Sequence, residues 1–328
     1  MRVLIVGASG MIGGRLAARL DETGRLGPGD ERGVTDLLLV DRSRPAFESR
    51  SGVRVETASA DVTDPRAAEL FAEWRPEVVF HLAAVVSGEA EARFELGYEV
   101  NVKGTWALLE AFRGAGHAPR FVFASSLAVY GPPFPDTVPD DFHLSPRSSY
   151  GAQKAMGELL VSDYTRKGFV DGIAIRLPTV VVRPGAPNAA ASGFLSSIIR
   201  EPLAGRPAVL PVPVETAAWI ASPRVAVETL LHAAALPAER IGDRRRLSGR
   251  GLSVTVAEMI EALRDVAGPG VADRIRREND PAVAAIVRSW PRRFEADGAT
   301  GLGFPVDRSM QAIIEAHLRD TADGRLVA

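Results

Sequence analysis

The sequence predicts an α/β fold: a doubly wound parallel sheet with helices on both faces, followed by a smaller C-terminal α/β lobe. Three observations support this prediction. Short apolar, β-branched runs alternate with longer helical patterns through the first half of the chain. A glycine-rich segment joins the first run to the first helical pattern. Beyond residue 178, proline and glycine become frequent and the expected elements become short.

The expected strands are apolar runs of a kind that is buried on both faces of a parallel sheet: 2–6, 36–40, 53–57, 77–82, 120–125 and 172–177. Helical patterns occupy 11–22, 65–74, 92–113, 149–167, 254–267 and 308–320. Segment 244–249 is expected to return to the sheet as a strand. We therefore expect a core domain of residues 1–177 with a returning segment at about 217–250, and a second lobe of residues 178–216 and 251–328.

Composition excludes several classes of function. The formal charge of -2 leaves no basic surplus for nucleic acid, and no apolar run approaches the roughly 18 residues of a membrane span. The first residues read as a buried strand instead of a signal peptide, so a cytoplasmic location is expected. The chain has no cysteine, which excludes disulfides and thiol nucleophiles, and its five histidines show no metal-ligand spacing. We expect no metal site.

The segment "VGASGMIGG" has the spacing of a dinucleotide-binding loop. Its first glycine would allow a tight turn, its second would let backbone approach a pyrophosphate, and its third would let the helix pack closely on the strand. The start of the following helix would offer free N–H groups and the positive end of its dipole to phosphate. The expected phosphate-binding residues are Gly7, Ser9, Gly10, Met11, Ile12 and Gly13.

Asp41 ends the second strand, where a carboxylate can accept hydrogen bonds from the adenosine ribose and would repel a 2′-phosphate. This favours NAD as the cofactor. Asp41 lies farther from the glycines than the usual about 20 residues, because a polar insertion at 23–33 intervenes. Arg42 and Arg44 leave NADP open, since arginines there can hold a 2′-phosphate.

Two later strand ends supply further expected cofactor contacts. Asp61 and Val62 would border the adenine, although Asp61 could equally be a helix N-cap. The fourth strand ends in small residues that would let the cofactor pass close to backbone, or that occur there by chance: Leu82, Ala83 and Ala84.

Ser126, Tyr150 and Lys154 form the expected catalytic set. Ser126 ends the fifth strand, at the sheet edge where ligands bind in this fold class. Tyr150 and Lys154 project from the same side of a helix. A nearby ammonium favours a phenolate, so Tyr150 could take a proton from a substrate hydroxyl while Ser126 positions the same oxygen. The alternative is a packed ring beside a solvated amine.

One long loop, 131–149, carries five prolines and separates Ser126 from Tyr150. Long loops in compact domains are often functional lids, which is the interpretation that we favour. A tolerated surface insertion is the alternative.

The motifs "GASGMIG", "HLAA", "NVKGT", "SSLAVYG" and "YGAQK", in this order, resemble the extended short-chain dehydrogenase/reductases, which include sugar-nucleotide epimerases and dehydratases. The resemblance implies a Rossmann core that binds NAD, a C-terminal substrate lobe and a homodimer formed through a four-helix bundle. It also implies catalytic roles for Ser126, Tyr150 and Lys154, of which the last two also contact the cofactor. It places Asn101 at a residue that supports the cofactor or a proton relay, unless that asparagine only kinks or caps its helix. It places Pro178 and Val180 beside the nicotinamide.

The segments "AAVVSGEAE", "YGAQKAMGELL" and "IIREPLAG" resemble one subgroup of that family, which oxidises a four-carbon sugar acid with NAD. Such a substrate needs a cation for its carboxylate, and Arg183 is our choice because a guanidinium can pair with it through two hydrogen bonds. A surface arginine beside a turn is the alternative. The expected substrate-binding residues are Ser87, Ser126, Tyr150, Thr179, Arg183 and Asn188, with Ser192 and His143 as further polar candidates.

Three functions stay open. The first is the dehydrogenation of a small sugar acid, with a uronate as an alternative substrate. The second is an epimerase or dehydratase acting on a nucleotide-sugar, for which the nearly uncharged segment "APNAAASGFLSS" offers few cations. The third is a dinucleotide-sensing regulator, which would not need both Tyr150 and Lys154.

Overall fold

The computed structural model describes all residues except 28–29, 31, 186–191, 289 and 323–328. Its largest unit is a parallel sheet of seven strands, in the order β10-β6-β5-β4-β1-β2-β3. The fold class predicted from the sequence is confirmed, including the return of segment 244–249 as β10. The strands are β1 (Arg2–Val6), β2 (Asp36–Asp41), β3 (Arg54–Ser59), β4 (Val78–His81), β5 (Arg120–Ser126), β6 (Asp171–Leu177) and β10 (Arg246–Ser248).

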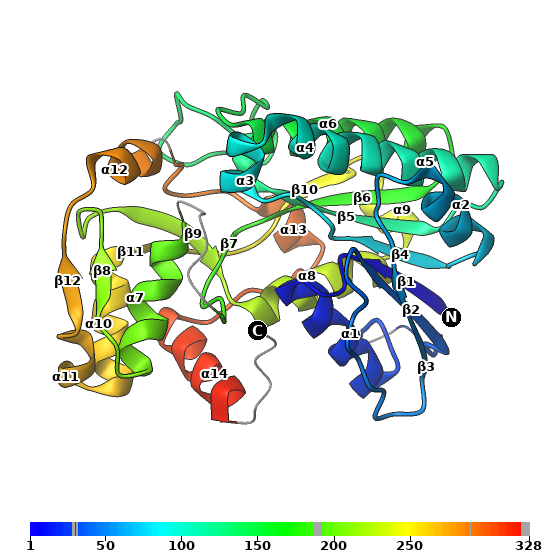
Figure 1. Cartoon of the computed structure of the whole chain (residues 1–328). Helices are drawn as coiled ribbons and strands as arrows, with labels where there is room; N and C mark the ends of the chain where they lie inside the picture. Colours follow the sequence, from blue (N-terminus) through cyan, green and yellow to red (C-terminus); the bar gives the residue numbers. More distant parts are fainter. Residues whose placement is uncertain (28–29, 31, 186–191, 289, 323–328) are drawn as a thin grey trace.

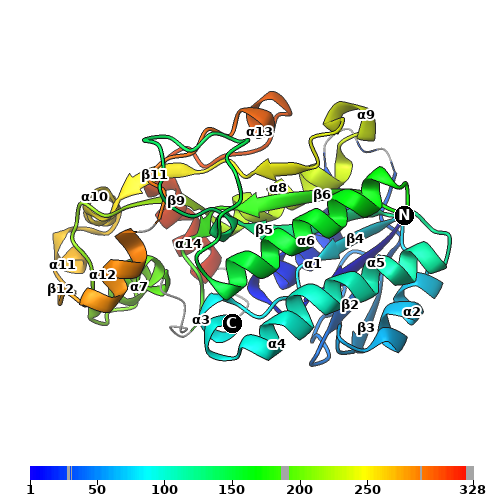
Figure 2. The ribbon, with the colours of Figure 1, turned by 90° about the horizontal axis from the view of Figure 1, so that it is seen from above.

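Helices cover both faces of this sheet (Figure 1). On one face lie α1 (Met11–Thr23) and α8 (Pro223–Ala235), whose apolar side chains share a buried cluster with β1, β5 and β6. On the other face lie α2 (Pro65–Glu73), α5 (Thr105–Gly114) and α6 (Ser149–Arg166), as Figure 2 shows from above. The central strands are therefore buried on both sides, which explains their uninterrupted apolar runs.

β3 is an exception, and the prediction that it is buried on both faces was wrong. It is the edge strand, and the side chains of Arg54, Glu56 and Ser59 are exposed. Polar residues interrupt its apolar run, as is common on a strand that has only one neighbour.

The single helix expected over 92–113 is also wrong in detail. The segment consists of α3 (Ser87–Ala92), α4 (Phe94–Tyr98), a π-helical turn (Glu99–Gly104) and α5. A π turn is a common way to redirect side chains at functional sites. Here the turn contains Asn101, which is buried and faces the end of β4.

The second lobe has its own apolar core and two small sheets (Figure 1). One contains β7 (Thr179–Val180), β9 (Ala217–Ala221) and β11 (Leu252–Thr255), and the other contains β8 (Ala208–Leu210) and β12 (Ile275–Arg277). The remaining helices are α7 (Gly193–Leu203), α9 (Ala238–Ile241), α10 (Val256–Ala267), α11 (Pro269–Ala272), α12 (Pro281–Arg288), α13 (Asp297–Gly301) and α14 (Met310–Ala322).

Two segments bear on the division of the chain into domains. β9, expected in the core domain, pairs with β7 and β11 in the lobe. Ala296, Ala299 and Phe304, expected in the lobe, pack into the apolar cluster below the large sheet. The exact boundaries stay a prediction. Within the described residues, no helix has both the length and the apolarity needed to cross a membrane.

Candidate functional site

The glycine loop between β1 and α1 has the geometry that a dinucleotide pyrophosphate requires. Gly7 has a φ of +98°, and a Cβ there would lie 2.5 Å from the backbone nitrogen of Ala83. A Cβ on Gly13 would lie 2.1 Å from the carbonyl oxygen of Gly7. Gly10 is the N-cap of α1 and provides no side chain to occupy the free N–H groups of the first turn. These features fit the dinucleotide predicted from the sequence.

Asp41 joins this loop to the end of β2. Its carboxylate accepts hydrogen bonds from the backbone nitrogens of Ser9, at 2.9 Å, and Arg42, at 2.7 Å. The Ser9 hydroxyl donates to the carbonyl of Ser43 at 3.2 Å. A negative charge is therefore held beside the glycine loop, at the place predicted for the adenosine ribose.

Asp61 forms a local turn. Its carboxylate accepts from the Thr63 backbone nitrogen at 2.9 Å and from the Thr63 hydroxyl at 2.8 Å. The helix N-cap suggested for Asp61 is instead Asp64, whose side chain accepts from Arg66. The neighbouring Val62 is buried against the large-sheet core. The adenine contacts of Asp61 and Val62 stay predictions.

Asn101 organises the loop that follows β4. Its side chain exchanges two hydrogen bonds with the backbone of Val85, at 2.8 and 3.0 Å, and donates to Gln153 at 2.7 Å. Asn101 therefore links the small residues after β4 to α6. Its predicted contact with the cofactor or with a proton relay is not tested by this geometry.

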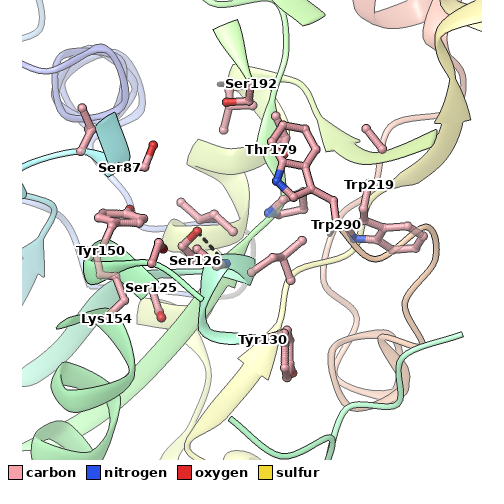
Figure 3. A pocket seen from close by; sticks show the side chains of 18 of the residues that line it. Ser87, Ser125, Ser126, Tyr130, Tyr150, Lys154, Thr179, Ser192, Trp219 and Trp290 are labelled. Atoms are coloured by element: carbon pink, nitrogen blue, oxygen red, sulfur yellow. Dashed lines mark hydrogen bonds between the residues drawn. The ribbon is translucent and has the colours of Figure 1, made fainter. Parts of the chain in front are cut away.

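The two serines at the end of β5 have different environments. Ser125 donates to the buried carboxylate of Glu158 at 2.6 Å. Ser126 accepts a hydrogen bond from the Ala128 backbone nitrogen at 3.2 Å, and it lies near enough to Tyr150 to lower the pKa of that phenol. Figure 3 shows Ser126 and Tyr150 close together at the cavity. This arrangement supports the predicted choice of Ser126 as the serine that meets the substrate.

The predicted lowering of the Tyr150 pKa by Lys154 together with an oxidised nicotinamide stays a prediction. Burial raises the pKa of Tyr150, while the Ser126 hydrogen bond and the charge of Arg183 partly oppose that rise. Burial lowers the pKa of Lys154 to about 8, although the Glu158 carboxylate opposes this change. Lys154 Nζ donates to the carbonyl of Ala124 at 2.8 Å and lies 5.7 Å from the centre of the Tyr150 ring.

A cavity of about 430 Å³ opens between the carboxyl ends of β5 and β6 and the second lobe. Most of the predicted catalytic and substrate residues line it, together with part of the predicted cofactor set: Ile12, Leu82, Ala84, Ser87, Ser126, Tyr150, Lys154, Pro178, Thr179, Val180, Arg183 and Ser192. The sequence therefore identified residues that lie together in space although the chain separates them widely.

Arg183 is the main cation on the lobe side of this cavity. It donates to the carbonyl of Val180 at 3.1 Å and to the hydroxyl of Ser192 at 3.3 Å. Burial lowers the pKa of Arg183, and the nearby Tyr150 opposes that change. No carboxylate of a described residue forms an ion pair with Arg183. A half-buried guanidinium of this kind suits a substrate carboxylate.

Some predicted residues lie elsewhere. His143 is exposed and stacks on Phe142, outside the lining of the cavity. Asn188 lies outside the described residues. The glycines of the loop, Asp41 and Asp61 are not part of the cavity lining. The glycines are predicted to hold the pyrophosphate of the cofactor, and the two aspartates its adenosine.

Several residues that line the cavity were not predicted from the sequence. They are mostly apolar or aromatic: Val86, Tyr130, Arg147, Trp219, Ile286, Trp290, Pro291 and Phe294. Trp219 donates its indole N–H to the carbonyl of Gly249 at 3.1 Å. Figure 3 shows Trp290 beside Thr179. The only available signal was that the chain has four tryptophans, and tryptophan alone does not distinguish a core residue from a binding residue.

The long loop 131–149 borders the cavity and is anchored to the body of the protein. Val138 donates a backbone hydrogen bond to Arg293 at 2.9 Å, and Asp140 accepts from the Gly298 backbone nitrogen at 2.8 Å. Phe142 packs near Tyr130, with ring centres 6.0 Å apart. The loop is thus an ordered wall of the cavity, and its motion as a lid stays a prediction.

No group of three or more histidine, aspartate or glutamate side chains in the described part of the chain could hold a metal ion.

Comparisons with known proteins agree with the geometry. D-erythronate dehydrogenase of Cupriavidus necator is 49% identical over 321 residues, which are 98% of this chain and 98% of the relative. D-erythronate dehydrogenase of Haemophilus influenzae is 41% identical over 315 residues, covering 96% of this chain and 98% of the relative. Both comparisons extend through the core domain and the second lobe.

Solved structures give the same fold. A crystal structure described as a nucleoside-diphosphate-sugar epimerase from Agrobacterium tumefaciens superposes with a TM-score of 0.95 at 49% identity, covering 99% of this chain and 96% of that chain. A GalE-like L-threonine dehydrogenase from Cupriavidus necator matches with a TM-score of 0.83 at 23% identity, which shows the fold alone. A model of the NAD dependent epimerase/dehydratase family matches residues 3–217. From the glycine loop, the Ser-Tyr-Lys arrangement and these matches, the chain belongs to the NAD dependent epimerase/dehydratase family.

Proposed function

We propose that this protein is a D-erythronate dehydrogenase, which oxidises D-erythronate to 2-oxo-D-erythronate with NAD. The observation that carries the proposal is a single cavity that combines Ser126, Tyr150 and Lys154 with the half-buried cation of Arg183. The first three suit the oxidation of a hydroxyl, and Arg183 suits a carboxylate next to it. The D-erythronate dehydrogenases at 49% and 41% identity support this substrate.

Each catalytic residue has a role that its contacts support. The phenol oxygen of Tyr150, once deprotonated, accepts the proton of the substrate hydroxyl as the adjacent carbon loses its hydride. The Ser126 hydroxyl, which lies close to Tyr150 (Figure 3), holds the same substrate oxygen. Lys154 is fixed between Ala124 and the Tyr150 ring, where its charge favours the phenolate and its ammonium can bind the nicotinamide ribose. Bound NAD supplies the hydride acceptor.

The proposed cofactor site follows the carboxyl edge of the sheet. The glycine loop and the N-terminus of α1 would hold the pyrophosphate, and Asp41 would bind the adenosine ribose. The residues after β4 would border the middle of the cofactor, and Pro178 and Val180 would border the nicotinamide. The tight contacts at Gly7 and Gly13 support this placement.

Arg183, Ser87, Thr179 and Ser192 are the proposed substrate contacts. Arg183 would pair with the carboxylate, and the three hydroxyl residues would bond with the hydroxyls of the acid. Figure 3 shows Ser87, Thr179 and Ser192 around the cavity that Ser126 and Tyr150 also line. Arg183 belongs to the same lining.

A nucleotide-sugar epimerase is the second candidate, because the Agrobacterium tumefaciens structure at 49% identity is described as one. Such an enzyme must hold a second pyrophosphate besides that of its cofactor. The lobe side of the cavity instead presents Arg183 and an apolar wall that includes Trp219, Trp290 and Phe294. The small acid is therefore the better fit.

The two candidates give different products in one assay. Purified protein should form NADH steadily when it is given NAD with D-erythronate, and more slowly with five- and six-carbon aldonates or uronates. An epimerase would convert a UDP-sugar without net NADH formation. If no sugar acid in this panel reduces NAD, the proposed function fails.

A homodimer remains a prediction, as does the cytoplasmic location. Three large apolar side chains are more than half exposed on neighbouring helices: Phe94 at 57% on α4, Trp106 at 52% on α5 and Leu159 at 54% on α6. α4, α5 and α6 lie side by side in Figures 1 and 2. This face supports pairing with a second copy of the chain, which light scattering of the purified protein would test.

A further inference from the structure

Three successive turns of α6 contact the last three residues of β5. Tyr150 lies close to Ser126 (Figure 3), Lys154 Nζ donates to the carbonyl of Ala124 at 2.8 Å, and Glu158 accepts from the hydroxyl of Ser125 at 2.6 Å. The mechanism proposed above uses the first two of these turns. It leaves the third, a completely buried carboxylate on Glu158, without a role.

Glu158 is held by a second strong contact. The guanidinium of Arg176 on β6 donates to both of its carboxylate oxygens, with Nε at 2.9 Å from one and Nη2 at 2.8 Å from the other. Arg176 is only 3% exposed. A pair of this geometry leaves the carboxylate almost no freedom to turn, so the oxygen that receives Ser125 has a fixed position.

The same network reaches a wall of the cavity. Arg176 also donates to the phenol oxygen of Tyr130, and that oxygen lies 3.1 Å from the hydroxyl of Ser248 on β10. Tyr130 lines the cavity and begins the loop that contains residues 131–149. One buried ion pair therefore connects β5, β6, β10 and α6 directly behind the catalytic residues.

Strand geometry gives this connection a specific consequence for Ser126. Successive side chains of a strand point to opposite faces, so the Ser125 hydroxyl meets Glu158 on one side while Ser126 lies on the other. Both residues line the cavity. Holding the Ser125 hydroxyl fixes the rotation of the strand end, and this in turn sets where the Ser126 hydroxyl lies relative to Tyr150. Stability alone is a weak reason for such a network, since buried ion pairs often contribute no more than well-packed apolar side chains.

We propose that Glu158, clamped by Arg176, is a positioning residue that acts through Ser125 to align Ser126 with Tyr150 for reaction. The inference rests on the proposed function only in assigning the catalytic roles of Ser126 and Tyr150. Glu158 itself touches neither substrate nor cofactor in this account. It acts on the geometry of the step in which the substrate hydroxyl gives its proton to Tyr150.

The variant Ser125→Ala tests this proposal because it removes the hydrogen bond between Glu158 and the end of β5 but leaves the Glu158–Arg176 pair intact. We expect kcat for D-erythronate to fall about 10- to 100-fold, the range expected when a catalytic group is slightly misplaced. KM for NAD should stay within about two-fold, and the deuterium isotope effect on kcat should rise because hydride transfer becomes slower. Ser125→Thr, which restores a hydroxyl, should recover most of the activity.

Ser162→Ala is the matched control. Ser162 is also on α6, and its hydroxyl donates to the backbone carbonyl of Glu158 at 2.8 Å instead of engaging the carboxylate. Its loss should leave kcat within about two-fold. A folded Ser125→Ala protein with unchanged kcat would overturn the proposal, and so would an equal loss in Ser162→Ala.

Glu158→Gln is the second variant, and it should reproduce the loss in kcat together with a lower melting temperature, since it leaves Arg176 without its full partner. If this variant does not fold, the kinetics of Ser125→Ala alone test the proposal.

A crystal structure of Ser125→Ala tests this proposal independently of the proposed function, because it needs no substrate. We expect the Ser126 hydroxyl to be displaced there relative to the Tyr150 phenol oxygen, compared with the wild-type structure. An unchanged position of Ser126 would contradict the proposed role of Glu158 even if the wild-type protein oxidised no sugar acid.

Discussion

The core domain and the second lobe contribute to the same cavity by different physical means. In the core, Ser126 and the glycine loop lie where strands of one parallel sheet end, so the backbone itself brings them together. In the lobe, Arg183, Trp219 and Trp290 come from short segments that meet only through tertiary packing. We propose from this comparison that the core provides the hydride-transfer chemistry, while the lobe selects the molecule on which it acts.

This division makes a general prediction. Substitutions on the core side should lower turnover of every substrate alike, whereas substitutions on the lobe side should change the relative rates of different acids. Each of four variants could contradict this separation of the core's effect on turnover from the lobe's effect on substrate preference.

Tyr150→Phe should lower kcat at least about 100-fold for every acid, because it removes the proton acceptor. NAD affinity, measured by protein fluorescence, should change little. In the wild-type enzyme kcat/KM for oxidation should increase with pH, because only the deprotonated phenol accepts a proton and burial raises the pKa of Tyr150. Turnover near the wild-type level would remove Tyr150 from the mechanism.

Arg183→Ala should raise KM for D-erythronate about 10- to 100-fold, the effect of losing hydrogen bonds to a charged group. KM for NAD should hardly change. Arg147→Ala is the matched control, since Arg147 also lines the cavity but is exposed and only donates to Pro132 at 3.3 Å. If Arg147→Ala has the larger effect, Arg183 is not the carboxylate ligand.

Asp41→Asn should shift the ratio of kcat/KM values for NAD and NADP about 10-fold toward NADP, because the charge that repels a 2′-phosphate is lost. The preference among acids should not change. Asp61→Asn serves as the comparison, since its carboxylate is bonded to Thr63 and should not distinguish the two cofactors. Steady-state kinetics with both cofactors measure the ratio, and an unchanged ratio in Asp41→Asn would exclude the proposed ribose contact.

Trp290→Ala should have the smallest effect. It should raise kcat/KM for five-carbon aldonates, relative to kcat/KM for D-erythronate, by about 5-fold. Extra hydroxyls placed against an indole ring lack partners, which costs binding energy. Trp219→Phe is the comparison, because it removes the bond to Gly249 but keeps an aromatic wall. A uniform loss for all acids in Trp290→Ala would show that this residue does not discriminate chain length.

The same comparison explains what could be predicted from the sequence. The large sheet, the glycine loop and the Ser126–Tyr150–Lys154 set carry local signals, because their geometry depends on strand ends and on helix spacing. The exposed edge at β3 and the π turn around Asn101 depend on neighbours in space and were missed. The contribution of Trp219 and Trp290 depends on how separate segments of the lobe pack, for which a single sequence offers no period or spacing.

The network behind the site shows a similar limit. Glu158 and Arg176 are visible in the sequence as two ordinary charged residues on a helix and a strand. Only the folded structure shows that both are buried and bonded to each other, and that Ser125 bonds to one of them. Their pairing follows from the contact of α6 with β5 and β6.

The most direct test of the central claim uses D-erythronate that carries deuterium at C2. Incubated with the protein and NAD, it should give NADH that contains one deuterium for each 2-oxo-D-erythronate formed, because the hydride comes from the carbon beside the carboxylate. Mass spectrometry of both products measures this ratio. Unlabelled NADH, or the absence of NAD reduction, would contradict the account.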